Sequence, residues 1–198
     1  SIESFVLGHS FDACVAVAGC DKNMPGAIIG MLRINRPSIM VYGGTIASGI
    51  YKGEKLNIVS ALEAFGKKIQ GTITPEDYDG VIRNACPGAG ACGGMYTANT
   101  MSSAIEALGM SLPYSASNPA NSPEKLRECR EVNHYLRILL EMDLKPKDIV
   151  TRKSIENAVR VAIALGGSTN AVLHLLAIAR TAGVNFSLQD FKELNAKT

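Results

Sequence analysis

The sequence predicts a helix-rich α/β fold with a mostly parallel, buried sheet, and three observations lead to it. Two short runs of apolar and β-branched residues, 13–18 and 38–42, have the length and composition of buried strands. Longer segments with apolar residues three and four positions apart alternate with these runs, which is helix spacing. Hydrophobic residues make up 46% and charged residues 19% of the 198 residues, as in an ordinary globular domain.

Several of the expected helices have recognisable start signals. Thr74 and Ser122 each precede a proline, which combines a capping hydroxyl with a residue preset for the first helical position. Thr151 is expected to cap a third helix. The expected helical segments are 1–9, 27–33, 58–69, 75–84, 96–108, 123–142, 152–165, 171–179 and 187–195. On the longest of them, the expected inner face consists of Leu126, Val132, Leu136, Leu139 and Leu140. The segment Gly43–Lys55 is expected to be an irregular loop because it is rich in glycine.

Composition and charge argue against several classes of protein. The net charge is +2, and no basic run or aromatic platform indicates nucleic-acid binding. No apolar run reaches the roughly 20 residues of a membrane-spanning helix. Five cysteines are an odd number in a chain of this size, which favours a reducing compartment, the bacterial cytoplasm or an organelle matrix, over a disulfide framework. Both termini border amphipathic segments, so we expect the sequence to be part of a longer protein.

The polar triplet Cys20-Asp21-Lys22 follows the first expected strand and precedes a helix. Ligand sites of α/β sheets collect at this edge, and such groups are costly there unless they bind something. Thiolate suits iron–sulfur clusters and carboxylate suits magnesium. Because consecutive side chains of an extended segment point to opposite sides, Cys20 and Asp21 are not expected to bind the same metal ion. Lys22 is either a counter-charge for Asp21 or, as a neutral amine, a site of carbamylation. The alternative is a plain turn in which Asp21 caps the helix and pairs with Lys22.

A second informative stretch begins at Cys86 and continues to Met95. Of the five residues between Cys86 and Cys92, three are glycine or proline, so the backbone can approach a ligand closely. The loop leads into a helix N-terminus, whose free N–H groups favour anions and anionic clusters. The spacing differs from that of zinc-binding cysteine pairs. The alternative is a turn with two small buried thiols.

Three further features have simpler interpretations beside the functional ones. The segment Gly166–Asn170 is either a ligand cradle between two buried helices or a helix break capped by Ser168 or Thr169. His174 is expected to be a packed core histidine rather than a metal ligand. Cys129, among charged neighbours on the longest helix, is expected to have no role in a site.

Four stretches together resemble the dihydroxy-acid/6-phosphogluconate dehydratase family. They are Gly-Cys-Asp-Lys-Asn-Met-Pro-Gly at 19–26, Val-Tyr-Gly-Gly-Thr at 41–45, the cysteine loop and following helix at 85–101, and Ala-Leu-Gly-Gly-Ser-Thr-Asn-Ala-Val-Leu-His-Leu at 164–175. They occur in the family's order, and the resemblance covers the whole chain. It implies that residues 1–198 are part of the N-terminal cluster- and magnesium-binding α/β domain, without the C-terminal domain.

The resemblance implies a [2Fe–2S] cluster and a Mg²⁺ ion side by side. Cys20 and Cys92 match two cluster ligands, and Asp21 matches a magnesium ligand. Lys22 matches a lysine that is carbamylated and reaches magnesium through its carbamate. The third cluster cysteine, the other magnesium carboxylates and the serine proposed as catalytic base are expected outside this sequence. We favour Cys92 over Cys86 because Cys92 directly precedes Gly93-Gly94 and the helix start, where the helix dipole stabilises thiolate. If both assigned cysteines are ligands, their sulfurs should lie within roughly 7 Å of each other.

The implied activity is dehydration of a 2,3-dihydroxy carboxylate, of the 2,3-dihydroxy-3-methylbutanoate type, to a 2-oxo acid. It belongs to isoleucine and valine biosynthesis and is carried out by a homodimeric hydro-lyase whose cluster acts as a Lewis acid. One alternative is a sugar-acid dehydratase of the same family, acting on 6-phosphogluconate or an aldonate. Another, from a different class, is an iron–sulfur redox or binding module. The 198-residue chain alone is expected to be inactive because it lacks several ligands and the base.

Overall fold

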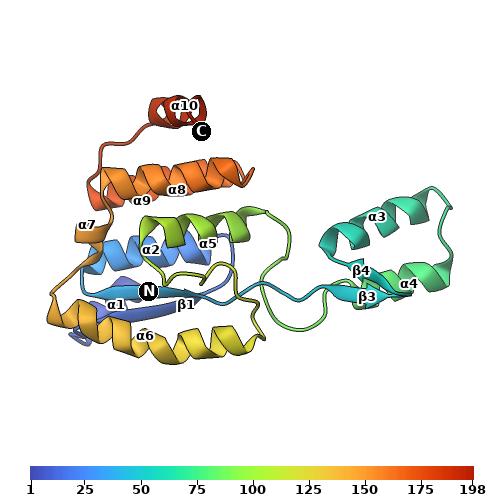
Figure 1. Ribbon diagram of the computed structural model, residues 1–198, viewed down its shortest axis with the longest axis horizontal. Coiled ribbons are helices and arrows are strands. Elements are labelled where there is room, and N and C mark those ends of the chain that lie inside the picture. The colour runs from blue at the N-terminus through green and yellow to red at the C-terminus, as the bar shows by residue number, and fades with distance from the viewer.

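The computed structural model describes residues 1–198 as ten helices and four strands (Figure 1). The helices are α1 (Ile2–Gly8), α2 (Asn23–Ile34), α3 (Ile58–Ile69), α4 (Pro75–Asn84), α5 (Thr97–Leu108), α6 (Pro123–Glu141), α7 (Pro146–Ile149), α8 (Arg152–Ala164), α9 (Asn170–Ala182) and α10 (Leu188–Asn195). The strands are β1 (Cys14–Ala18), β2 (Ser38–Tyr42), β3 (Gly49–Tyr51) and β4 (Glu54–Leu56). None of the helices combines the length and apolarity that crossing a membrane requires.

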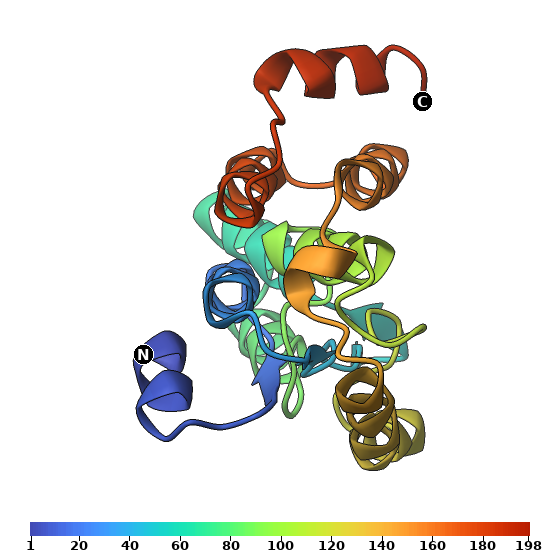
Figure 2. The ribbon, with the colours of Figure 1, turned by 90° about the vertical axis from the view of Figure 1, so that its left-hand side faces the viewer.

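Helices are stacked in layers on one face of a small parallel sheet (Figures 1 and 2). In the first layer, α2 contacts both strands of the sheet and α5 packs beside α2, and α9 and α8 pack on top of these two helices. The main hydrophobic core fills the space between these layers and includes Met24, Ile28, Met101, Ile105 and Leu175. On the opposite face of the sheet, α6 covers β2. The layers therefore leave the carboxyl ends of β1 and β2 beside the starts of α2 and α5.

The sheet is smaller than predicted. β1 and β2 pair in parallel, with Ala18 opposite Tyr42, and the other two strands form a separate antiparallel pair. The predicted strands 13–18 and 38–42 are confirmed almost to the residue, but a large parallel sheet is not present. Burial on both faces is correct for β2 and wrong for β1, because α6 lies over β2 and leaves Val15 and Val17 exposed.

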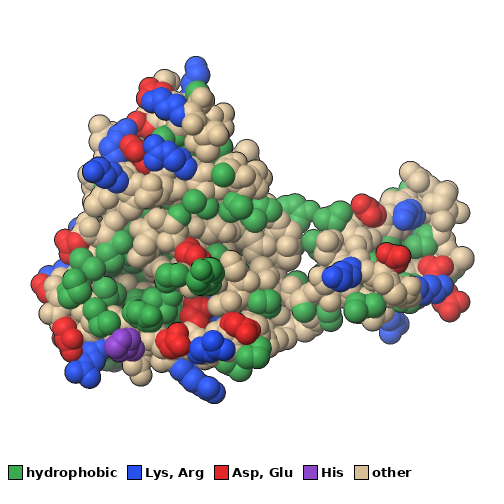
Figure 3. Space-filling model, viewed as in Figure 1, with side chains coloured by type: hydrophobic (Ala, Val, Ile, Leu, Met, Phe, Trp, Pro, Cys, Tyr) green, Lys and Arg blue, Asp and Glu red, His purple; other side chains and the backbone are tan.

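A hairpin and two helices form a unit that projects from the body on a narrow neck (Figures 1 and 3). The segment expected to be an irregular loop contains this hairpin, β3–β4, so that expectation is wrong. Lys52 and Gly53 at its tip both have positive φ angles, 51° and 84°, as a type I′ turn requires. Helix α3 spans the predicted residues, but its apolar stripe faces outward, with Leu62 60%, Phe65 53% and Ile69 73% exposed.

The predicted helix caps are present. The hydroxyl groups of Thr74, Ser122 and Thr151 accept hydrogen bonds from backbone N–H groups at 3.1, 3.1 and 3.3 Å. The predicted inner face of α6 is only partly correct. Val132 is buried and Leu136 and Leu139 pack beside it, but two members are exposed, namely Leu126 and Leu140.

Two charged residues take the inner position on α6 instead. Lys125 and Glu128 are 3% and 5% exposed and pair at 2.6 Å. The Lys125 ammonium also donates to the carbonyl of Ser115 at 2.9 Å. This turn of α6 therefore packs against a polar loop and not against an apolar surface. The spacing of the leucines does not predict the burial of two charged residues there.

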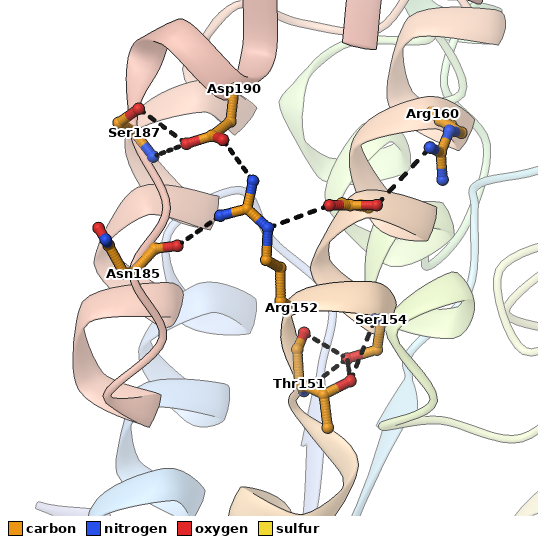
Figure 4. Close-up of polar contacts among 8 residues, drawn as sticks. Thr151, Arg152, Ser154, Arg160, Asn185, Ser187 and Asp190 are labelled. Carbon is orange, nitrogen blue, oxygen red and sulfur yellow. Dashed lines mark hydrogen bonds and ion pairs between the residues drawn. The ribbon is translucent and has the colours of Figure 1, made fainter. Parts of the chain in front are cut away.

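Helix α10 is attached to α8 by a polar network around Arg152 (Figure 4). The guanidinium of Arg152 donates to the carbonyl of Asn185 at 2.8 Å and to the carboxylate of Asp190. The hydroxyl and backbone N–H of Ser187 each donate to Asp190 at 2.7 Å. Hydrogen bonds from the Ser187 hydroxyl and from Arg152 lower the pKa of Asp190 to about 2.

Candidate functional site

The triplet Cys20-Asp21-Lys22 forms a turn between the end of β1 and the start of α2. The thiol of Cys20 lies 3.4 Å from Oδ1 of Asp21, and the ammonium of Lys22 donates to Oδ2 at 2.7 Å. The hydrogen bond from Lys22, followed by that from Cys20, lowers the pKa of Asp21 below its usual range. The prediction that Cys20 and Asp21 point apart is wrong, because the chain has already left the extended conformation here.

The simpler interpretation of this turn is correct in one respect. Asp21 pairs with Lys22, but it does not cap α2: the N-cap is Lys22, and no side chain accepts a hydrogen bond from the first turn. All of the triplet is accessible, with Cys20 and Lys22 exposed and Asp21 half-buried. The thiol, the carboxylate and the amine are therefore available to a ligand.

The loop that carries Cys92 packs its backbone directly against the segment after β2. The N–H of Ala91 donates to the carbonyl of Gly44 at 2.9 Å, and the N–H of Ile46 donates to the carbonyl of Ala91 at 2.8 Å. Gly90 has φ 135°, and a Cβ on it would lie 2.4 Å from the backbone nitrogen of Ile46. Glycine at 90 thus permits a close approach between two backbone segments, and the expected approach of the loop to a ligand stays a prediction. The pairing holds half-buried Cys92 near the carboxyl end of β2.

A buried tyrosine connects the two cysteine-bearing segments. Tyr42, the last residue of β2, donates from its hydroxyl to Oδ1 of Asn99 at 2.8 Å. Asn99 in turn donates to the carbonyl oxygens of Cys92 and Gly94 at 2.9 and 2.6 Å. Burial raises the pKa of Tyr42 to about 12, and negative charge on Cys92 and Cys20 raises it as well. The predicted sulfur–sulfur separation of Cys20 and Cys92 stays a prediction. Cys86, at the other end of the loop, is exposed.

Three helices, α2, α5 and α9, begin around this site, and α2 and α5 have no side-chain cap. The starts of α5 and α9 are joined by a 2.8 Å hydrogen bond between the hydroxyls of Thr97 and Ser168. The longer helices elsewhere begin with capping side chains, namely Asn57, Thr74, Ser122 and Thr151. Uncapped N–H groups and the positive ends of three helix dipoles favour negative charge at the site.

The Gly166–Asn170 segment is fastened to α5. The N–H of Ser168 donates to Thr100 at 2.9 Å, and the amide of Asn170 donates to Thr97 at 3.1 Å. The hydroxyl of Ser168 also accepts from the N–H of Asn170 at 3.3 Å, so the helix-break interpretation is supported. A cavity of about 520 Å³ opens on the far side of this segment, between α8, α9 and α10. The ligand-cradle interpretation stays a prediction.

His174 lies on α9, which packs against α2. Its Nε2 is buried and has no hydrogen-bond partner. Burial, followed by the positive charge of Lys22, lowers the pKa of His174, so the imidazole is neutral at pH 7. It is a half-buried histidine beside a polar cluster, which only partly matches the expected packed core residue.

Sequence reasoning missed Tyr42 and Asn99 as parts of the site. A signal for Tyr42 was available, because a buried tyrosine hydroxyl needs a partner. Asn99 is likewise unusual as an amide in a helix of small and apolar residues. Neither signal identifies the two residues as each other's partner, since they come from different elements.

The donor set suits part of a cluster and magnesium site. It offers two thiols for iron and a carboxylate for magnesium, beside helix ends that favour negative charge, and the amine of Lys22 could add an oxygen ligand only as a carbamate. Nowhere do three or more His, Cys, Asp or Glu side chains come close enough together to hold a metal ion. These residues therefore fit as a partial ligand set and not as a complete one.

Fold and site define a helix-rich α/β protein with a thiol- and carboxylate-bearing site at the carboxyl ends of two parallel strands. All of residues 1–198 match the family described as dihydroxy-acid/6-phosphogluconate dehydratase N-terminal. The chain belongs to this family.

The similar curated proteins are considerably longer than this chain. It is 64% identical over 193 residues to the dihydroxy-acid dehydratase of Flavobacterium psychrophilum, an alignment that covers 98% of the chain and 35% of that protein. Over 198 residues it is 64% identical to the dihydroxy-acid dehydratase of Cytophaga hutchinsonii, covering 100% of the chain and 35% of that protein. The chloroplastic dihydroxy-acid dehydratase of Arabidopsis thaliana is 56% identical over 195 residues, which are 98% of the chain and 32% of that protein. The chain spans about a third of the length of these relatives.

Proposed function

We propose that this chain carries half of the metal site of a dihydroxy-acid dehydratase, a hydro-lyase that converts 2,3-dihydroxy carboxylates to 2-oxo acids in branched-chain amino acid biosynthesis. The observation that carries the proposal is that the segment after β2 is bonded to both cysteine-bearing segments: the N–H of Gly43 donates to the carbonyl of Ala18, and the N–H of Ala91 donates to the carbonyl of Gly44. The names of the relatives support the same reaction. We further propose that the full-length protein is a homodimer.

Each polar residue of the site has a definite task in this proposal. Cys20 and Cys92 hold a [2Fe–2S] cluster, and Asp21 holds Mg²⁺ through its carboxylate. Lys22 becomes a further oxygen ligand when its neutral amine adds to CO₂ and releases a proton, which forms a carbamate. The exposure of Lys22 supports this role, because CO₂ and metal can reach the nitrogen without rearrangement of the core.

Carbamylation also changes the charge balance of the turn. Lys22 now neutralises Asp21 across 2.7 Å. A carbamate would replace that positive charge with a negative one, so that two anionic groups face the same space. This arrangement is stable only with a cation between them. The uncapped starts of α2 and α5 would favour the anionic carboxylate of the substrate near the same place.

When bound, the cluster and Mg²⁺ supply Lewis-acid chemistry, which makes the substrate's 3-hydroxyl a better leaving group and its C2 proton more acidic. The chain's own residues hold and orient these groups. A base that takes the C2 proton, and the remaining ligands, are assigned to parts of the full-length protein outside residues 1–198, since only a partial ligand set is present here.

Turnover by the full-length protein that contains this chain tests the proposal. Reconstituted anaerobically with iron, sulfide and magnesium, it should form 2-oxo acid from 2,3-dihydroxy-3-methylbutanoate. Preferential turnover of 6-phosphogluconate would instead identify a sugar-acid dehydratase. A cluster that is reduced and oxidised reversibly, with neither substrate consumed, would indicate a redox module.

Variants of the turn test the residue assignments. Asp21→Asn should abolish magnesium-dependent activity and leave the visible cluster absorbance in place, whereas Cys20→Ser should remove the absorbance. Cys129→Ser is the matched control, because Cys129 is an exposed thiol on α6. Equal loss of iron in Cys20→Ser and Cys129→Ser would contradict the assignment of Cys20.

A further inference from the structure

A buried chain of hydrogen bonds runs from the end of β2 to the loop that carries Cys92. Tyr42 is 0% exposed, and its hydroxyl donates to Oδ1 of Asn99 at 2.8 Å. The amide nitrogen of Asn99 donates to the carbonyl of Cys92 at 2.9 Å and to that of Gly94 at 2.6 Å. The single acceptor atom and both donor hydrogens of the Asn99 side chain are thus engaged.

These hydrogen bonds fix the backbone conformation around Cys92 and therefore the direction in which its side chain points. The residues around Cys92 include several glycines, whose backbone has many accessible conformations. Two hydrogen bonds from one amide group select a single conformation by holding carbonyl groups two residues apart. Asn99 itself lies in the first turn of α5, a helix buried along most of its length. The loop is therefore oriented by the core of the protein.

Tyr42 also provides the link to Cys20. Its position in the register is opposite Ala18, and Cys20 follows Ala18 by two residues. The N–H of Gly43 donates to the carbonyl of Ala18 at 2.8 Å, which extends the pairing toward the Cys20 turn. The end of β2 is thus connected to the Cys20 segment through the backbone of Gly43 and to the Cys92 loop through the hydroxyl of Tyr42 and Asn99.

We propose that Tyr42 and Asn99 are positioning residues, which hold the Cys92 thiolate in register with Cys20 and thereby control the retention and the reduction potential of a cluster bound between them. The part that concerns the cluster rests on the proposed function, whereas the placement of Cys92 does not. Tyr42 is not a ligand, because its hydroxyl hydrogen is directed at Asn99. Groups that orient ligands in this way tune metal sites, and their loss typically weakens metal retention by about 10- to 100-fold.

Two nearly isosteric substitutions test the hydrogen bond from Tyr42 and those from Asn99 separately. Tyr42→Phe removes the hydroxyl and leaves both bonds from Asn99 to the loop. Asn99→Asp keeps the acceptor for Tyr42 and removes both donors to the loop. Tyr51→Phe is the matched control, because Tyr51 also donates from its hydroxyl to a side chain, Asp77, at 3.1 Å, but lies in the projecting unit.

Three measurements are made on the full-length protein that contains this chain. They are the reduction potential of the reconstituted cluster, the half-life of its visible absorbance in air, and the alkylation rate of Cys92 in the metal-free protein, measured by mass spectrometry relative to Cys129. Tyr42→Phe and Asn99→Asp should each shift the potential, shorten the half-life by about tenfold, and raise the alkylation rate of Cys92 by about tenfold. The double variant should show little more than the larger single effect, because both residues act through one connection.

Unchanged potential and unchanged Cys92 alkylation in both variants would overturn the proposal. So would equal changes in Tyr51→Phe, since these would reflect general destabilisation. The melting temperature of each variant is measured as well. If the cluster half-life shortens only as the melting temperature falls, while the reduction potential and the alkylation rate of Cys92 are unchanged, the role of Tyr42 and Asn99 is purely structural and the proposal is wrong. If the unsubstituted protein takes up no cluster, the proposed function fails, and the alkylation of Cys92 still decides whether Tyr42 and Asn99 position it.

Discussion

Breaking the buried ion pair of α6 should destabilise the protein far more than breaking an exposed pair on the same helix. In Lys125→Met, the carboxylate of Glu128 would stay buried without its cationic partner. Its Oε1 atom already has no hydrogen-bond partner, and Oε2 would retain only the amide of Asn118 at 3.5 Å. Removing one member of a buried pair costs about 3–5 kcal/mol of unfolding free energy. With a urea m-value of about 3 kcal/mol/M, the unfolding midpoint should fall by about 1–2 M.

Arg137→Met supplies the control. Arg137 pairs with Glu141 at 2.8 Å, one turn apart on the same helix, but both side chains are largely exposed. Such a pair contributes about 0.3–0.5 kcal/mol, so its loss should move the midpoint by less than about 0.3 M.

The double variant Lys125→Met/Glu128→Met completes the test. Apolar side chains of similar length remove both buried charges together, so the stability should return to within about 1 kcal/mol of the unsubstituted protein or exceed it. Urea unfolding followed by circular dichroism measures all of these effects. Equal midpoints for Lys125→Met and Arg137→Met, or a double variant less stable than Lys125→Met, would refute the reasoning.

Four further predictions concern the cysteines, the chain as a unit, α10 and the cysteine loop. In the full-length protein, Cys92→Ser should abolish the visible cluster absorbance and Cys86→Ser should leave most of it; the reverse would exchange their roles. The 198-residue chain alone, reconstituted anaerobically, should show no dehydratase activity, and turnover near that of the intact enzyme would mean that the missing ligands lie within it. The pKa of Asp190 is lowered to about 2, so its stabilising effect should be complete above its unfolded pKa of about 4 and be lost as the pH falls toward 2. Hydrogen exchange of the α10 amides measures this loss. Protection of α10 that depends equally on pH in Asp190→Asn would contradict the prediction. Gly90→Ala should separate the Cys92 loop from Ile46 and lower the melting temperature, whereas Gly53→Ala, with open space around it, should cost only the strain of a positive φ.

The element boundaries and the cysteine loop could be predicted from the sequence because their causes are local. Thr74, Ser122 and Thr151 act on N–H groups within three residues, so the helix starts that they mark are where we expected them. The type I′ hairpin at Lys52-Gly53 was also a local signal, but the glycine content of its surroundings obscured it. Burial was predicted less well, since it depends on which neighbour covers a face.

The sequence by itself determined which residues are chemically able to form the site. Its order of residues places Cys20, Asp21 and Lys22 at a strand end, and Cys92 before a helix. Tertiary structure alone decided that the segment after β2 is bonded both to the end of β1 and to the Cys92 loop, because these contacts join residues far apart in the sequence. It also decided what surrounds each face: α6 covers β2 but not Val17, and α3 keeps an open apolar stripe. Apolar periodicity in the sequence indicates that a helix or strand has an apolar face, but only the tertiary structure determines which element packs against that face and buries it.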